Sequence, residues 1–169
     1  MLNSWSNDKL EQVVAGYSIG GGGKRVDALL RTAGLIRSMV FAEIKHHRTP
    51  LLEAKPYRTD CWAPSQELAG GVIQAQQTVY RAAQDLSDRL RDKDASGADL
   101  DTDTYLIRPR SFLIIGSLAE LRGEVGVHSA KQRSFELFRR NLYEPEILTF
   151  DELLARAEWH LAAAEDDSA

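Results

Sequence analysis

The stretch Ser38-Met39-Val40-Phe41-Ala42-Glu43-Ile44-Lys45 decides the fold, because a short apolar run ends in two charged residues. Runs of this length and composition are typical of a buried strand, predicted here over residues 39–45. A second apolar run, residues 24–31, carries Asp27. For Asp27 to lie opposite Glu43 in an antiparallel hairpin, paired residue numbers must sum to 70, which centres the turn on Leu35. A register shifted by one residue would place the two acids on opposite faces.

The two acids and the lysine predict a charged site. A buried carboxylate is costly without a partner, so Asp27, Glu43 and Lys45 at one place suggest a cation between the acids. Glu43 and Lys45 are two residues apart and share one face of the strand. A plain ion pair at the strand end is the alternative. Glu53-Ala54-Lys55 repeats the spacing without a preceding strand and is predicted to be surface charge.

The rest of the chain predicts an α/β domain with the element order βββαβαβα. An N-terminal strand is expected over residues 11–18, and a long helix from Pro64 and Ser65 to about residue 92. Residues 93–104 are polar and acidic and are predicted to be a flexible loop within a single domain, 1–169. The remaining predictions are a buried strand over 111–117, a helix over 130–143, a strand over 145–148, a last helix from the capping box Thr149-x-x-Glu152, and a frayed acidic tail, 165–169.

Composition excludes several classes of function. The 169 residues are 43% hydrophobic with a net charge of −4, so the chain is neither disordered nor a polycation that coats nucleic acid. Residues 22–58 hold eight Lys or Arg against three acids, which makes this stretch the candidate anion-binding region. The single Cys61 cannot form an internal disulfide, and no apolar run approaches the roughly 18 residues of a membrane helix. We expect a cytoplasmic protein that has no membrane partner.

The predicted long helix carries Gln74, Gln76 and Tyr80. Gln76 and Tyr80 are four residues apart and share one face. A glutamine can hold a carboxylate, a metal-bound water or a phosphate oxygen without changing the charge of a site. A solvated, Gln-rich helix surface is the alternative.

These motifs together resemble the PD-(D/E)xK nuclease superfamily, through Asp27, through Glu43-Ile44-Lys45 and through a helix with Gln-x-x-x-Tyr. The chain resembles more closely still the C-terminal nuclease domain of Shedu anti-phage defence proteins. That similarity includes Arg-Val-Asp-Ala-Leu-Leu, Phe-Ala-Glu-Ile-Lys and Pro-Ser-Gln-Glu-Leu-Ala-Gly-Gly-Val-Ile-Gln, and extends to residues 112–116, 134–140 and 146–154. The resemblance implies a restriction-endonuclease-like core, a mixed β-sheet flanked by helices, DNA phosphodiester hydrolysis in a prokaryotic cytoplasm, and a homo-oligomer.

The implied site consists of a metal centre and a phosphate-binding surface. Asp27, Glu43 and the Ile44 carbonyl would hold Mg²⁺ or Mn²⁺, because these ions prefer hard oxygen ligands. Lys45 would orient the attacking water, and Gln74 or Gln76 would position a ligand. The expected DNA-binding residues are Lys24, Arg25, His46, His47, Arg48, Lys55, Arg58 and Tyr80. Two alternatives share the fold: a non-catalytic module that binds DNA ends or proteins, and a DNA-repair nuclease.

Two departures from the superfamily pattern lead to further expectations. Val26 replaces the usual proline, which leaves the metal chemistry unchanged. A helix with an extra acid usually precedes the first strand, but only about ten residues precede Glu11. Either that helix is absent or, as we expect, this chain is the C-terminal domain of a longer protein with a regulatory N-terminal region. The apolar residues of the helix expected over 134–143 cover more than one face, so they cannot all point at one core. This pattern favours an oligomer interface. The residues are Phe135, Leu137, Phe138, Leu142 and Tyr143.

Overall fold

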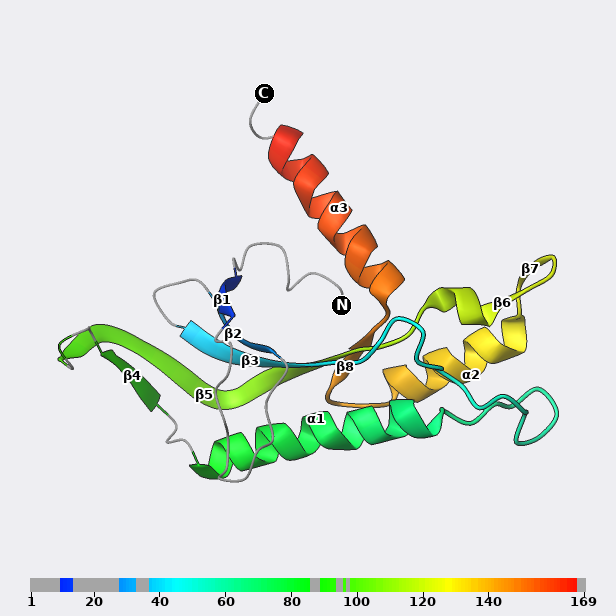
Figure 1. The fold of residues 1–169 in the computed structure, drawn as a ribbon, viewed down its shortest axis with the longest axis horizontal. Helices are drawn as coiled ribbons and strands as arrows, with labels where there is room; N and C mark the ends of the chain where they lie inside the picture. Colours follow the sequence, from blue (N-terminus) through cyan, green and yellow to red (C-terminus); the bar gives the residue numbers. More distant parts are fainter. Residues whose placement is uncertain are drawn as a thin grey trace. The chain divides into compact units, whose positions relative to one another are not determined.

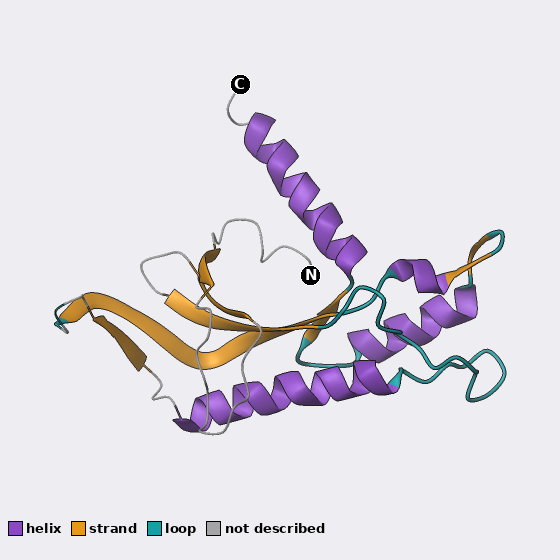
Figure 2. Cartoon of the chain, in the orientation of Figure 1, coloured by secondary structure: helices purple, strands orange, loops and turns teal. Residues whose placement is uncertain are grey.

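The fold is α/β, as predicted, and the computed structural model describes residues 10–13, 28–32, 37–85, 89–93, 96 and 98–166 (Figures 1 and 2). The strands are β1 (Leu10–Val13), β2 (Ala28–Thr32), β3 (Arg37–Ile44), β4 (Arg89–Lys93), β5 (Asp99–Ile114), β6 (Arg122–Gly123), β7 (Gly126–Val127) and β8 (Glu146–Leu148). The helices are α1 (Gln66–Asp85), the short 3₁₀ helix η1 (Leu118–Leu121), α2 (Ser129–Arg140) and α3 (Phe150–Asp166).

The chain groups into two compact units. The first unit combines Met1–Glu43 with Ile73–Phe112, and the second combines Ile44–Val72 with Leu113–Ala169. The units divide β3, α1 and β5 between them. The main sheet has the strand order β1-β2-β3-β5-β4, with β8 paired to β5.

The first unit contains the predicted hairpin. Strands β2 and β3 pair antiparallel with Ala28 opposite Ala42 and Leu30 opposite Val40, so paired residue numbers sum to 70 as predicted. Strand β1 pairs antiparallel with β2. Residues 39–43 of β3 are all buried. Burial of both faces fixes the register, because a slip of one residue would move every side chain to the other face.

The predictions of a helix to residue 92 and of a loop over 93–104 are both wrong. Helix α1 ends at Asp85, and residues 89–93 form β4, which pairs antiparallel with β5. The register sets Arg91 opposite Asp103 and Lys93 opposite Asp99. The acidic, polar composition of residues 93–104 had suggested a solvated loop instead of a pair of strands. Leu90 continues the helical spacing of apolar residues but lies in β4.

The C-terminal ends of three strands lie in the second unit. The Lys45 N–H donates to the Ile114 carbonyl at 2.8 Å, and the Ile115 N–H donates to the Leu148 carbonyl at 2.9 Å. The C-terminal ends of β3, β5 and β8 therefore lie side by side, which is the parallel arrangement and makes the whole sheet mixed. The core of this unit is a cluster of buried apolar residues: Leu51, Leu52, Leu68, Val72, Leu113, Ile115, Leu121, Phe135 and Ile147.

Local sequence signals define the helices of this unit. The Ser65 hydroxyl accepts from the Leu68 N–H at 3.0 Å, which confirms the predicted start of α1. The Thr149 N–H donates to the Glu152 carboxylate at 3.0 Å, and the Glu152 N–H donates to the Thr149 hydroxyl at 3.4 Å. These bonds confirm the capping box that begins α3. Glu165 and Asp166, placed in the predicted tail, belong to α3, and residues 167–169 lie outside the described residues.

Candidate functional site

Glu43 is the last residue of the first unit along β3, and its side chain is only 6% exposed. It follows four buried apolar residues, which hold it at the end of the strand. An acid so deeply buried must interact with other polar groups, since an isolated buried carboxylate is costly. The prediction of a buried acid at this strand end is confirmed.

Asp27 lies outside the described residues, as do Lys24 and Arg25. The described register reaches Ala28, which pairs with Ala42. The pairing of Asp27 with Glu43 therefore stays a prediction. This pair would directly follow the described pair of Ala28 and Ala42 if the register continued.

Ile44 and Lys45 belong to the second unit. Ile44 ends β3 with its side chain 42% exposed, and Lys45 is half-buried. The bond from the Lys45 N–H to the Ile114 carbonyl continues the β3–β5 pairing one residue beyond the strand. This bond fixes the backbone at the residue expected to act on the attacking water.

Gln74, Gln76 and Tyr80 lie in the part of α1 that belongs to the first unit, and all three side chains are exposed. The buried residue between the glutamines is Ala75. Successive helix residues are about 100° apart, so Gln74 and Gln76 point to opposite sides of the buried face. Only one of them can serve a given site, and the choice stays open. The Tyr80 hydroxyl accepts a hydrogen bond from Gln84 at 2.8 Å.

The predicted phosphate-binding residues of the second unit are solvent-accessible. His46, His47 and Arg48 follow β3 directly and are exposed. The His46 and His47 rings are 4.2 Å apart, and the Arg48 N–H donates to the Nδ1 atom of His46 at 3.1 Å. Lys55 and Arg58 are exposed in the loop that follows.

A carboxylate that the sequence did not reveal anchors the chain after these residues. Glu120, in η1, accepts hydrogen bonds from the N–H groups of Leu51 at 2.6 Å and Leu52 at 3.0 Å. The two partners lie almost seventy residues away in the chain, so no local pattern signals the contact.

Glu53, predicted to be surface charge, is exposed but also accepts from the Gln66 N–H at 3.0 Å at the start of α1. An acid there satisfies a free helix N–H group.

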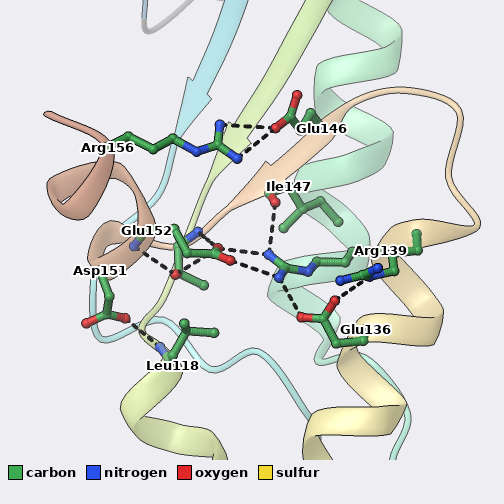
Figure 3. Close-up of polar contacts among 10 residues, drawn as sticks. Leu118, Glu136, Arg139, Glu146, Ile147, Asp151, Glu152 and Arg156 are labelled. Carbon is green, nitrogen blue, oxygen red and sulfur yellow. Dashed lines mark hydrogen bonds and ion pairs between the residues drawn. The ribbon is translucent and has the colours of Figure 1, made fainter. Parts of the chain in front are cut away.

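A second polar group missed by sequence reasoning joins α2 to α3 (Figure 3). The Arg139 guanidinium donates to both carboxylate oxygens of Glu152 at 2.8 Å, to the Ile147 carbonyl at 3.4 Å, and to Glu136. Glu136 also accepts from Arg140 at 2.6 Å. The group lies at the start of α3 and contacts β8 through the Ile147 carbonyl.

The charges in this group hold one another ionised. Burial opposes ionisation of Glu152, but hydrogen bonds from Arg139 and Thr149 outweigh it, so the pKa of Glu152 is lowered from 4.5. Burial is likewise outweighed at Glu136 by hydrogen bonds from Arg139 and Arg140, and its pKa is also lowered. The pKa of Arg139 is raised, because its bonds to both acids outweigh its own burial. The group is a structural clamp without a perturbed acid or base suited to catalysis at neutral pH.

Among the described residues, no three His, Cys, Asp or Glu side chains gather closely enough to form a metal site. Glu43 and the Ile44 carbonyl are the described groups that the sequence had assigned to a metal. No helix within the described ranges is long and apolar enough to span a bilayer.

Comparison with known proteins shows the class of this chain. Residues 5–154 match the model of the family described as Shedu protein SduA, C-terminal, so the chain belongs to that family. One curated relative is the Shedu protein SduA of Bacillus cereus (strain B4264), which is 31% identical over 139 residues. The matched region covers 80% of this chain and 34% of the relative, so the chain spans about a third of that protein's length. The predicted resemblance to the C-terminal domain of Shedu proteins is confirmed.

Proposed function

We propose that this chain is a metal-dependent DNA endonuclease of the PD-(D/E)xK type that acts in anti-phage defence. One observation carries the proposal: the β2–β3 register sums to 70 and leads to a buried acid at the end of β3. If the register continues by one residue beyond the described pairs, Asp27 would lie opposite Glu43. Membership of the Shedu protein SduA C-terminal family supports the biological setting.

The proposed metal ligands are Asp27, Glu43 and the Ile44 carbonyl. All three are hard oxygen donors, which suit Mg²⁺ or Mn²⁺. A buried Glu43 fits such an ion, because a divalent cation offsets the cost of burying a carboxylate. When bound, the metal supplies charge neutralisation at the scissile phosphate and lowers the pKa of a water.

Lys45 is the proposed catalytic cation. It follows Glu43 by two residues, and along a strand this spacing puts both side chains on the same face. Its backbone N–H is bonded to the Ile114 carbonyl, so the side chain extends from a fixed point of the backbone. There Lys45 would orient the attacking water and offset the negative charge that develops on the phosphate.

The remaining predicted residues hold and position the DNA. His46, His47 and Arg48 follow Lys45 and are exposed, so they are accessible to phosphates beside the scissile bond. Lys24, Arg25, Lys55 and Arg58 are proposed to bind phosphates further along the strand. One of Gln74 and Gln76 would position a ligand by neutral hydrogen bonds, with Tyr80 beside Gln76 on the helix.

The proposal is tested by incubating the purified chain with linear and supercoiled DNA, with and without Mg²⁺, beside Glu43→Ala. Cleavage that requires Mg²⁺ and disappears in the variant supports a nuclease. DNA binding that needs no metal and survives the substitution, with no cleavage by the parent, would instead indicate a non-catalytic module. Thermal unfolding of both proteins shows that the variant is folded.

A further inference from the structure

The loop between β3 and α1 contains a small, hydrogen-bonded turn at residues 55–61, here called the Tyr57 loop. The Tyr57 N–H donates to the Cys61 carbonyl at 2.9 Å, and the Cys61 N–H donates to the Arg58 carbonyl at 3.0 Å. Asp60 adopts a φ of 57°, which closes the turn and is a conformation that Asp tolerates better than most residues. Backbone hydrogen bonds therefore hold the tip in one shape.

Helix α2 braces this turn within the same unit. The Trp62 N–H donates to the Ser134 hydroxyl at 3.1 Å, and the Arg133 guanidinium donates to the Asp60 carbonyl at 3.5 Å. The Trp62 ring meets the His128 ring edge to face, with centroids 5.0 Å apart. A turn fixed at its base in this way presents its tip with little entropy left to lose on binding.

The tip exposes an aromatic ring among cations. Tyr57 is 72% exposed, and the Arg58 guanidinium lies 5.5 Å from the centre of its ring. Lys55, Arg58 and Arg133 are all exposed. The one acid of the turn is Asp60, so the turn together with Arg133 carries three cations against one carboxylate.

From this geometry we infer that the Tyr57 loop binds a single-stranded DNA segment, with one base stacked on Tyr57 and phosphates held by Lys55, Arg58 and Arg133. An exposed ring is a stacking platform for an unpaired base, and neighbouring cations follow the backbone. The local positive charge within a chain of net charge −4 matches a polyanion. The choice of DNA rests on the proposed nuclease function. The loop would bind single-stranded DNA through residues other than the catalytic ones. It would raise the affinity for DNA without taking part in the cleavage reaction.

The test measures binding of the whole chain to a fluorescent oligonucleotide without divalent metal, so that cleavage plays no part. A single-stranded oligonucleotide and a blunt duplex are titrated against the parent, Tyr57→Ala and Arg58→Ala. Tyr143→Ala and Arg140→Ala are the matched controls, since both residues are exposed and lie at or beyond the other end of α2. Unfolding curves show that each variant is folded.

Tyr57→Ala should weaken single-strand binding by about fivefold or more while changing duplex binding less. Arg58→Ala should lower the slope of log affinity against log salt by about 0.7, the value for one phosphate contact on a single strand. The two control variants should bind like the parent. Equal weakening on duplex and single strand would overturn the stacking role, and unchanged affinity in both loop variants, or no DNA binding by the parent, would overturn the inference. A change in oligomeric mass with unchanged DNA affinity would assign the loop to a protein interface instead.

The result of this binding test can be separated from the result of the cleavage test of the proposed nuclease. Loss of cleavage in Glu43→Ala with normal binding by both loop variants would remove only the loop inference. Weakened binding by Tyr57→Ala in a chain that never cleaves DNA would remove only the nuclease.

Discussion

Gly116→Ala should destabilise the second unit strongly, because Gly116 combines a left-handed backbone with a crowded position. Its φ is +64°, and an added Cβ would lie 2.7 Å from the Thr49 carbonyl oxygen and 2.7 Å from a methyl group of Leu51. Gly116 also donates its N–H to the His46 carbonyl and accepts from the Phe150 N–H. The backbone therefore has little freedom to move away from the clash.

The magnitude follows from two contributions. A non-glycine residue in the left-handed region costs roughly 1–2 kcal/mol, and overpacking against a fixed carbonyl costs about 1–3 kcal/mol. We expect a loss of about 2–5 kcal/mol, which for a chain of this size lowers the melting temperature by roughly 4–20 °C.

Gly70→Ala is the matched control. Gly70 lies in α1 with nothing within 4 Å of an added Cβ, so alanine should raise stability by up to about 1 kcal/mol through its better helix propensity. Urea unfolding, followed by circular dichroism and tryptophan fluorescence, compares both variants with the parent. If Gly116→Ala unfolds within about 0.5 kcal/mol of the parent, a value typical of neutral surface changes, the reasoning about this turn is refuted.

Three further predictions concern the clamp, the loop anchor and the catalytic lysine. Glu136 and Glu152 have lowered pKa values in the folded chain, so their stabilisation is present above pH 4.5 and is lost as the pH falls; urea midpoints measured from pH 7 to pH 3 should show that loss, and Arg139→Met should flatten it. Glu120→Ala should cost about 1–3 kcal/mol, because two backbone N–H groups lose their acceptor, and a variant as stable as the parent in urea would contradict this anchor. Lys45→Ala should lower the single-turnover cleavage rate far more than DNA affinity, whereas a lower melting temperature with unchanged activity would indicate only an ion pair.

Sequence reasoning succeeded where local signals and burial agreed. The hairpin register could be predicted because an apolar run ends in an acid, and residues 39–43 are buried on both faces. Thr149 and Glu152 form a capping box whose two bonds join residues three positions apart, so it is visible in the sequence. Helix α2 and strand β8 were also predicted from the pattern of their own residues.

Sequence reasoning failed where the decisive partner is distant in the chain or where one pattern allows two structures. Residues 89–93 continue a helical spacing, and only the pairing with β5 makes them a strand. Glu120 carries no local signal, since its partners are the N–H groups of Leu51 and Leu52. In the candidate site, burial of Glu43 was predictable, whereas the exposure of both glutamines on either side of Ala75 needed the helix itself.

The most direct test of a metal-dependent nuclease compares two glutamates that share the spacing acid-x-Lys. Glu43 is buried at the end of β3, and Glu53 is exposed in a loop, where glutamine can still accept the Gln66 N–H bond. Single-turnover cleavage of supercoiled DNA in Mg²⁺ is measured for the parent, Glu43→Gln and Glu53→Gln. We predict a fall of about 100-fold or more for Glu43→Gln, since it removes a charged metal ligand, and a rate near that of the parent for Glu53→Gln. Equal rates for Glu43→Gln and the parent would contradict the metal site.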